Sequence, residues 1–202
     1  AVCPMEAEFG QPQWTFGGSL YAFSESKIIC SYSKGGHSYL AEINTTTGAM
    51  ASLDVPYSAI LRVQTTAGRA GLIAASATEP TSVVEVNLAT RDLKVLRRSR
   101  DVGLDPGYLS MPRSVEFPTE NGHTAHAIFY PPQNGDYVRD ENEKPPLLVM
   151  SHGGPTASTS MSLQYSVQYW TSRGIAVLDV NYRGSSGYGR AYRERLKGKW
   201  GA

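Results

Sequence analysis

The sequence predicts a fold of two parts: repeated sheets of short antiparallel strands, followed by the beginning of an open α/β sheet. Two observations lead to this fold class. The first half of the chain repeats its apolar segments at a constant spacing. The second half contains an apolar run, a glycine turn, a helical pattern and a second apolar run, in that order.

The repeat is found by placing Leu40–Asn44 over Val83–Asn87, which lie 43 positions further along the chain. The same offset aligns residues 28–33 with 71–76. It also aligns residues 50–53 with 93–96, and no gap is needed in any of these alignments. Short β-type segments with a period in the low forties are typical of the four-stranded blades of a β-propeller. A small β-sandwich with accidental spacing is the alternative.

Each repeat is predicted to contain four strands joined by tight turns. The expected strands are 20–23, 27–32, 38–43 and 49–53 in the first unit, and 60–64, 70–75, 82–87 and 93–96 in the second. Gly35-Gly36 supplies the positive φ that a tight hairpin needs. Because a blade buries its faces against neighbouring blades, and a closed ring has at least four, we expect further blades outside this sequence.

A linker rich in Gly and Pro, residues 106–112, is predicted to separate the two parts of the chain. We therefore place the blades at residues 1–110 and the second part at residues 111–202. Just after the linker, Asn121-Gly122 is the strongest short hairpin signal in the chain, because this dipeptide favours the positive φ angles of a two-residue turn.

The second part is organised around Pro145–Gly189. Within it, Leu147–Met150 and Ile175–Val180 are short unbroken apolar runs, which predict strands buried on both faces of a parallel sheet. A helical pattern between them predicts a helix over 162–172 that packs across one face of the sheet. The order predicts a right-handed crossover in which the two strands are parallel neighbours.

The glycine turn between the first of these strands and the helix reads His152-Gly153-Gly154-Pro155. Because glycine has no Cβ atom, such a turn lets backbone N–H groups approach the oxyanion that develops during acyl transfer. Most Gly-Gly pairs are only turns. A turn that follows a buried strand and precedes a helix is a stronger signal, since one N–H of this loop forms half of the oxyanion hole in α/β-hydrolases.

Together with NYRGSSGYG at residues 181–189, the HGGP turn resembles the start of the hydrolase domain in the prolyl oligopeptidase family of serine peptidases. The resemblance is greatest to the acylaminoacyl-peptidase and dipeptidyl-peptidase-like branch. It implies C-terminal blades of a β-propeller at 1–110 and the N-terminal part of an α/β-hydrolase domain, incomplete, at 111–202. It also implies a serine peptidase that hydrolyses short or N-terminally blocked peptides through an acyl-enzyme.

The resemblance assigns roles to residues of the two motifs. Gly154 is expected to contribute its backbone N–H to the oxyanion hole, and Gly153 to permit the close approach. His152 is expected to shape the loop, while the catalytic base of the family comes from elsewhere. Support of the loop is expected from His152, Pro155, Tyr182 and Arg183.

No catalytic residue can be assigned in this sequence. A nucleophile elbow requires G-x-S-x-G, and around Ser186 the second glycine position holds Tyr188. We therefore expect the nucleophile, acid and base to lie beyond Ala202, and the 202-residue chain to be inactive alone.

Composition excludes several classes of partner. Lys and Arg total 19 against 18 Asp and Glu, a formal charge of +1, so global charge favours neither nucleic acid nor an anionic membrane. No apolar run approaches the roughly 18 residues of a membrane span. Cys3 and Cys30 fit no metal spacing, and we expect two reduced thiols in a cytoplasmic protein.

The resemblance implies a peptide substrate and neither a cofactor nor a metal, and it leaves the oligomeric state open, a homo-oligomer included. Two other functions remain. One is a non-peptidase α/β-hydrolase such as an esterase, because HGG occurs there too. The other is a propeller-type interaction module whose hydrolase part is vestigial.

Overall fold

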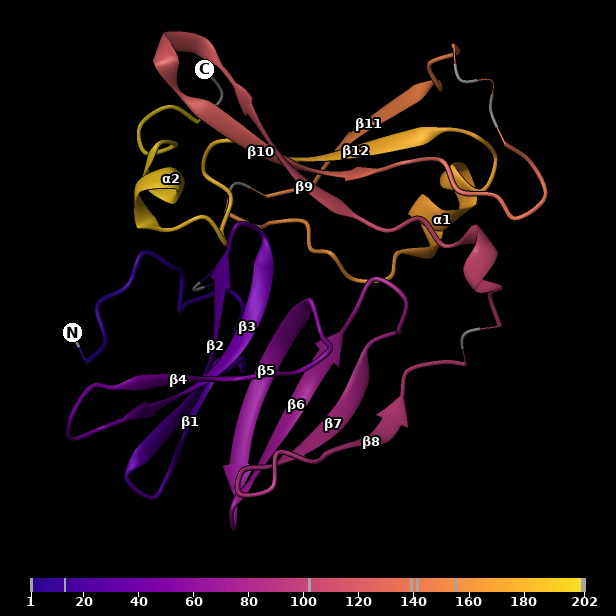
Figure 1. The fold of residues 1–202 in the computed structure, drawn as a ribbon. Coiled ribbons are helices and arrows are strands. Elements are labelled where there is room, and N and C mark those ends of the chain that lie inside the picture. Colours follow the sequence, from indigo (N-terminus) through magenta and orange to yellow (C-terminus); the bar gives the residue numbers. More distant parts are fainter. Residues whose placement is uncertain are drawn as a thin grey trace.

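The computed structural model describes residues 2–12, 14–101, 103–138, 140, 142–154 and 156–200. These residues form three four-stranded sheets. In Figure 1 two antiparallel sheets lie below, and a mixed sheet with two short helices lies above them. The predicted fold class, propeller-type blades followed by an α/β sheet, is confirmed.

The two antiparallel sheets are the predicted blades. The first contains β1 (Tyr21–Ser24), β2 (Lys27–Lys34), β3 (His37–Asn44) and β4 (Met50–Leu53), and the second β5 (Ala59–Thr66), β6 (Arg69–Ala75), β7 (Ser82–Asn87) and β8 (Leu93–Arg98). In both sheets each strand pairs with the next one along the chain. The strand order is therefore the same in the two repeats, as the sequence predicted.

The offset between the two blades is not constant along the repeat. Asn44 and Asn87, 43 positions apart, cap equivalent turns, because each side chain accepts hydrogen bonds from two backbone N–H groups that follow it. Lys27, however, pairs with Asn44, whereas Arg69 pairs with Asn87, so β2 and β6 match 42 positions apart. The predicted gapless register is wrong for the first two strands of the blade. The connection 76–81 between β6 and β7 contains the additional residue.

A core fills the space between the two blades. Ile29 and Leu40 of the first blade and Leu72 and Val84 of the second are all buried and belong to one apolar cluster. Because side chains on neighbouring positions of a strand point to opposite faces, this cluster takes one face from each sheet. The two blades therefore stack face to face, as neighbouring blades of a propeller do.

The mixed sheet has the strand order β11-β12-β10-β9. Its strands are β9 (Arg113–Pro118), β10 (Thr124–Tyr130), β11 (Leu147–Ser151) and β12 (Ala176–Asn181). A single 3-10 turn, η2 (Glu120–Gly122), joins β9 to β10, and both Asn121 and Gly122 have positive φ there, 59° and 71°. The Asn-Gly hairpin predicted from the sequence is confirmed.

The crossover is also confirmed. β11 and β12 are parallel neighbours, with Ser151 opposite Val180. The helix between them, α1 (Tyr165–Thr171), packs Val167 against Val177 and is shorter than predicted. Before the helix, the backbone N–H of Leu163 donates to Ser76 O of the second blade, 2.7 Å away. After β12, α2 (Arg190–Glu194) occupies only part of the helical pattern near the end of the chain.

The prediction that Leu147–Met150 is buried on both faces is wrong. Leu147 and Val149 are 52% and 59% exposed, whereas Leu148 and Met150 pack against the core under α1. β11 is an edge strand, and in Figure 1 both helices lie on the side of the mixed sheet that faces the blades. The other face of β11 is therefore uncovered in this chain.

Several contacts join the blades to the mixed sheet. Ser58 Oγ donates to Met161 O (2.6 Å), and Ser114 Oγ donates to Gly35 O (3.2 Å). Between the two parts the chain passes through η1 (Pro106–Tyr108), and the domain division at residue 110 stays a prediction. Among the described helices, none has both the length and the apolar character needed to span a bilayer.

Candidate functional site

Two loops meet at one edge of the mixed sheet. Residues 152–154 follow β11, and residues 182–189 follow β12. Because β11 and β12 are parallel neighbours, their carboxyl ends lie at the same edge, where open α/β sheets bind their ligands. The sheet therefore brings together the two motifs that the sequence analysis singled out.

The first loop presents unpaired backbone donors to solvent. Gly153 and Gly154 are both exposed, and Gly154 has a φ of +73°, which an L-residue adopts only with strain. Within the described part of the chain, the N–H groups of these two glycines donate no hydrogen bond. Two neighbouring donors in this state can serve an anionic oxygen.

Tyr182 holds the peptide at Gly154. Its hydroxyl donates to Gly154 O at 2.7 Å, and its ring stacks on the imidazole of His152 with centroids 4.4 Å apart. The carbonyl of Gly154 belongs to the peptide bond that follows Gly154, so this contact anchors the loop directly after the Gly154 N–H. The predicted supporting role of Tyr182 thus corresponds to a specific contact between the two loops.

A serine that the sequence analysis did not select holds His152. Ser185 is fully buried, its Oγ donates to Tyr182 O at 2.7 Å, and it lies 2.7 Å from His152 Nε2. A hydroxyl has one hydrogen, so the donor toward Ser185 must be the Nε2–H of His152. The contact with Ser185 thereby fixes the imidazole as a structural group. In the sequence, the only indication that Ser185 has a role was its position within the motif at residues 181–189.

A second layer of polar contacts fixes the segment after the glycine turn. Thr159 N donates to Asn181 Oδ1 (2.9 Å), and Thr159 Oγ1 donates to Asp179 Oδ2 (2.5 Å). Asn181 Nδ2 also donates to the Tyr188 hydroxyl at 3.0 Å. Burial raises the pKa of Tyr188 to about 12, so this hydroxyl remains neutral at ordinary pH. Asp179 and Asn181 at the end of β12, together with Tyr188 in the turn after it, thus support the segment that follows the glycine turn.

The structure brings His152, Gly153, Gly154 and Tyr182 together. Pro155 lies outside the described residues. Arg183 is exposed and lines a cavity of about 580 Å³, and its role stays a prediction. Among the described residues, no group of three or more His, Cys, Asp or Glu side chains could hold a metal ion.

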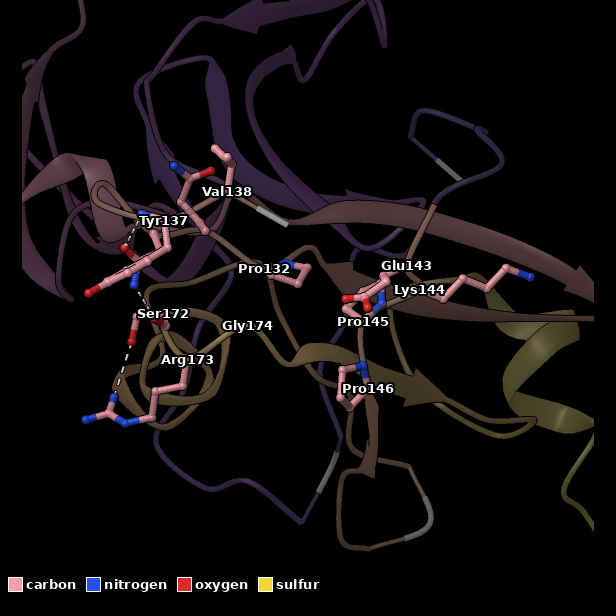
Figure 2. Close-up of a pocket in the computed structure, with 12 residues that line it drawn as sticks. Pro132, Tyr137, Val138, Glu143, Lys144, Pro145, Pro146, Ser172, Arg173 and Gly174 are labelled. Carbon is pink, nitrogen blue, oxygen red and sulfur yellow. Dashed lines mark hydrogen bonds between the residues drawn. The ribbon is translucent and has the colours of Figure 1, made fainter. Parts of the chain in front are cut away.

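A larger cavity of about 780 Å³ lies at the opposite end of the parallel strands. Figure 2 shows it between the loop 132–146 and the end of α1, with Pro146 on one side and Gly174 on the other. These residues immediately precede β11 and β12, so the cavity borders the amino ends of the strands. We therefore place the candidate site at the glycine loops.

Comparison with known proteins shows similarity to one peptidase family. Residues 161–202 match the Prolyl oligopeptidase family. A puromycin-hydrolyzing peptidase of Mycobacterium tuberculosis is 37% identical and superposes with a TM-score of 0.91 over 97% of this chain and 30% of that chain. A puromycin hydrolase is 36% identical, with a TM-score of 0.92 over 100% of this chain and 31% of that chain.

Dipeptidyl-peptidase 5 of Schizosaccharomyces pombe is 28% identical over 159 residues, 78% of this chain and 21% of that protein. The chain thus spans less than a third of the length of these relatives. The superposition with the puromycin hydrolase covers 100% of this chain and therefore includes both the blades and the glycine loops.

Proposed function

Because the chain is related to the prolyl oligopeptidase family of serine peptidases, we propose that it forms part of a serine peptidase and supplies half of the oxyanion hole. In this role the backbone N–H of Gly154 binds the oxygen of the tetrahedral intermediate, and Gly153 keeps side-chain atoms away from it. The reaction is acyl transfer: a serine oxygen attacks the substrate carbonyl, the amine leaves, and water hydrolyses the acyl-enzyme.

The observation that carries this proposal is the pair of exposed, unpaired glycine N–H groups at the carboxyl end of β11. Tyr182 and Ser185, from the turn after β12, fix the orientation of that loop before any substrate arrives. Donors that are already oriented need no reorganisation when charge develops, which is why such groups lower a reaction barrier.

The nucleophile in this proposal comes from outside the sequence. β11 is an edge strand and can accept one more parallel strand on its other side. Such a strand would place its carboxyl end beside Gly154, and a serine on the turn after it could reach a carbonyl bound at the glycine N–H groups. The uncovered face at Leu147 and Val149 would pack against the same additional segment.

For the substrate we propose short or N-terminally blocked peptides. The relatives include a puromycin hydrolase and a dipeptidyl-peptidase. The amino-acid part of puromycin is joined to the rest of the molecule by an amide bond, as in a peptide. Blades that stand against the mixed sheet would restrict the site to small substrates. The non-peptidase hydrolase and the interaction module remain outcomes of the test.

A substitution at Gly154 tests the proposal in a form of the protein that includes the nucleophile. Gly154→Ala keeps the backbone N–H but places a Cβ atom at a φ of +73°, so the strained loop should turn this donor away from the oxyanion. We expect kcat for a dipeptidyl anilide to fall by up to roughly 10²–10³-fold, the effect of losing one oxyanion donor completely. Gly174→Ala is the matched control, because Gly174 has a similar φ of +82°, has equally open surroundings and lies at the other end of the strands. Equal kcat in the two variants would refute the oxyanion role, hydrolysis of aryl esters alone would indicate an esterase, and no hydrolysis by the unsubstituted form would indicate an interaction module.

A further inference from the structure

A glutamate near the start of the chain is buried at the border between the first blade and the mixed sheet. Glu8 is 5% exposed and pairs through its backbone with Ser33 of β2, with N–H···O distances of 2.9 and 2.8 Å. The backbone contact fixes Glu8 to the blade. Its side chain points away from that blade, toward the turn that follows β12.

The carboxylate of Glu8 has two partners in the second part of the chain. Gly187 N–H donates to Oε2 at 2.6 Å, and the guanidinium of Arg193 in α2 forms an ion pair with Oε1. The side chain of Glu8 is only 4% exposed, against 34% for Arg193. A buried carboxylate is tolerated when it is paired and hydrogen-bonded in this way, and removal of either partner is costly.

The turn that Glu8 holds is the one that supports the candidate site. On its other side, Ser186 N donates to Ala157 O at 3.0 Å, and Ser186 Oγ donates to Thr156 O. One residue earlier, Ser185 holds His152. The turn is thus held between a blade residue and the loop that contains the unpaired glycine N–H groups.

From these contacts we propose that Glu8 is a positioning residue, which acts through the turn 182–187 to hold the oxyanion loop in register. The proposal rests on the proposed function for its effect on catalysis. Its structural part stands on the contacts of Glu8 alone. Glu8 touches no reacting atom, so its substitution should change how well the loop is oriented while the binding of substrate changes little.

Hydrogen exchange in the 202-residue chain tests the structural part without any enzymatic assay. Glu8→Met keeps the length of the side chain and removes both interactions, and it should speed exchange of the segment 184–189 about tenfold or more relative to the unsubstituted chain. Glu8→Gln keeps an oxygen for Gly187 N–H and should give an intermediate rate. Glu6→Gln is the control, because Glu6 is exposed and belongs to the same segment.

Unchanged exchange of 184–189 in Glu8→Met would overturn the proposal. If Glu8→Met instead speeds exchange throughout the first blade, the effect on 184–189 could follow from loss of blade structure. Arg193→Met then tests the proposal, because Arg193 lies in α2, outside the blade. Faster exchange of 184–189 in Arg193→Met, with β2 and β3 unaffected, supports the proposal. Exchange in Arg193→Met equal to that of the control contradicts it.

Kinetics in a form that hydrolyses peptides tests the catalytic part. Glu8→Gln should lower kcat several-fold and leave KM within about twofold, because only the orientation of the oxyanion donor changes. A merely structural glutamate would lower thermal stability and leave kcat of the folded enzyme unchanged, and that outcome would overturn the positioning role. If no form hydrolyses peptides, the proposed function fails, whereas the exchange result still decides whether Glu8 holds the turn.

Discussion

The Nε2 atom of His152 lies 2.7 Å from the hydroxyl oxygen of Ser185. Such a pair has the spacing of a nucleophile and its base. Here, however, the serine is fully buried and donates its hydrogen to Tyr182 O, so the histidine must donate to it. The pair therefore holds the glycine loop in place and has no access to a substrate.

Substitution of Ser185 should measure the strength of this contact. Ser185→Ala leaves His152 Nε2–H without its acceptor, and we expect the free energy of unfolding to fall by about 1–3 kcal/mol. Chemical denaturation checks this value. Ser99→Ala, at an exposed serine of the second blade, should change stability by less than about 0.5 kcal/mol. A loss no larger than in this control would contradict the assigned contact.

The hydroxyl of Tyr182 can be removed by itself. Tyr182→Phe keeps the ring on His152 but loses the bond to Gly154 O, so unfolding free energy should fall by about 0.5–1.5 kcal/mol. The same measurement on Tyr137→Phe, where the tyrosine is 78% exposed, should show almost no change. In a form that hydrolyses peptides, only the first of these variants should lower kcat.

Alanine substitutions at two glycines with nearly equal φ can distinguish the cost of backbone strain from the cost of a steric clash. Gly36 has a φ of +79°, and a Cβ atom there would lie 2.6 Å from the Tyr188 hydroxyl. Gly68 has a φ of +76°, with no atom within 4 Å of the corresponding position. Both alanine variants should be destabilised by strain, and Gly36→Ala should lose more in a thermal melt because Tyr188 must also move. Equal losses would mean that the close approach of Gly36 to Tyr188 contributes nothing to stability.

The ion pairs of Glu42 should make stability depend on acid pH. Burial raises the pKa of Glu42, but its hydrogen bonds and charge interactions with Lys27 and Arg91 outweigh burial and hold the pKa below the ordinary value of 4.5. A carboxyl whose pKa is lower in the folded state stabilises the fold above its unfolded pKa, and this contribution disappears as the pH falls through the folded pKa. The stability difference between the unsubstituted chain and Glu42→Gln should therefore shrink on acidification below about pH 4.5. A difference that stays constant from pH 6 to about pH 3 would contradict this assignment.

Regular features of the fold could be predicted from the sequence. The blades follow from apolar segments that recur at a nearly constant spacing, and the parallel pair follows from two apolar runs around one helical pattern. The exposure of Val149 could not be predicted, because an apolar run does not tell an inner strand from an edge strand. The shift from 43 to 42 positions was missed because one extra residue in a polar connection leaves no apolar trace.

The site was predictable only where a motif names the residue. Gly154 and Tyr182 could be selected from two motifs, and the structure joins them by a hydrogen bond. Ser185 and Glu8 were missed, because a serine or glutamate outside a catalytic pattern gives no sign of being buried. Glu8 contacts Gly187, 179 positions away, and single-sequence patterns contain no information on such pairs. A cytoplasmic location stays a prediction.

The measurement that tests the account most directly is labelling by a serine-directed phosphonate that carries a fluorophore. In the proposed peptidase this chain supplies oxyanion donors, and none of its serines is the nucleophile. The 202-residue chain should therefore remain unlabelled, and a longer form that includes the segment proposed to carry the nucleophile should be labelled once per molecule. Stoichiometric labelling of the 202-residue chain at Ser185 or any other serine, with turnover of a peptide substrate, would contradict the account.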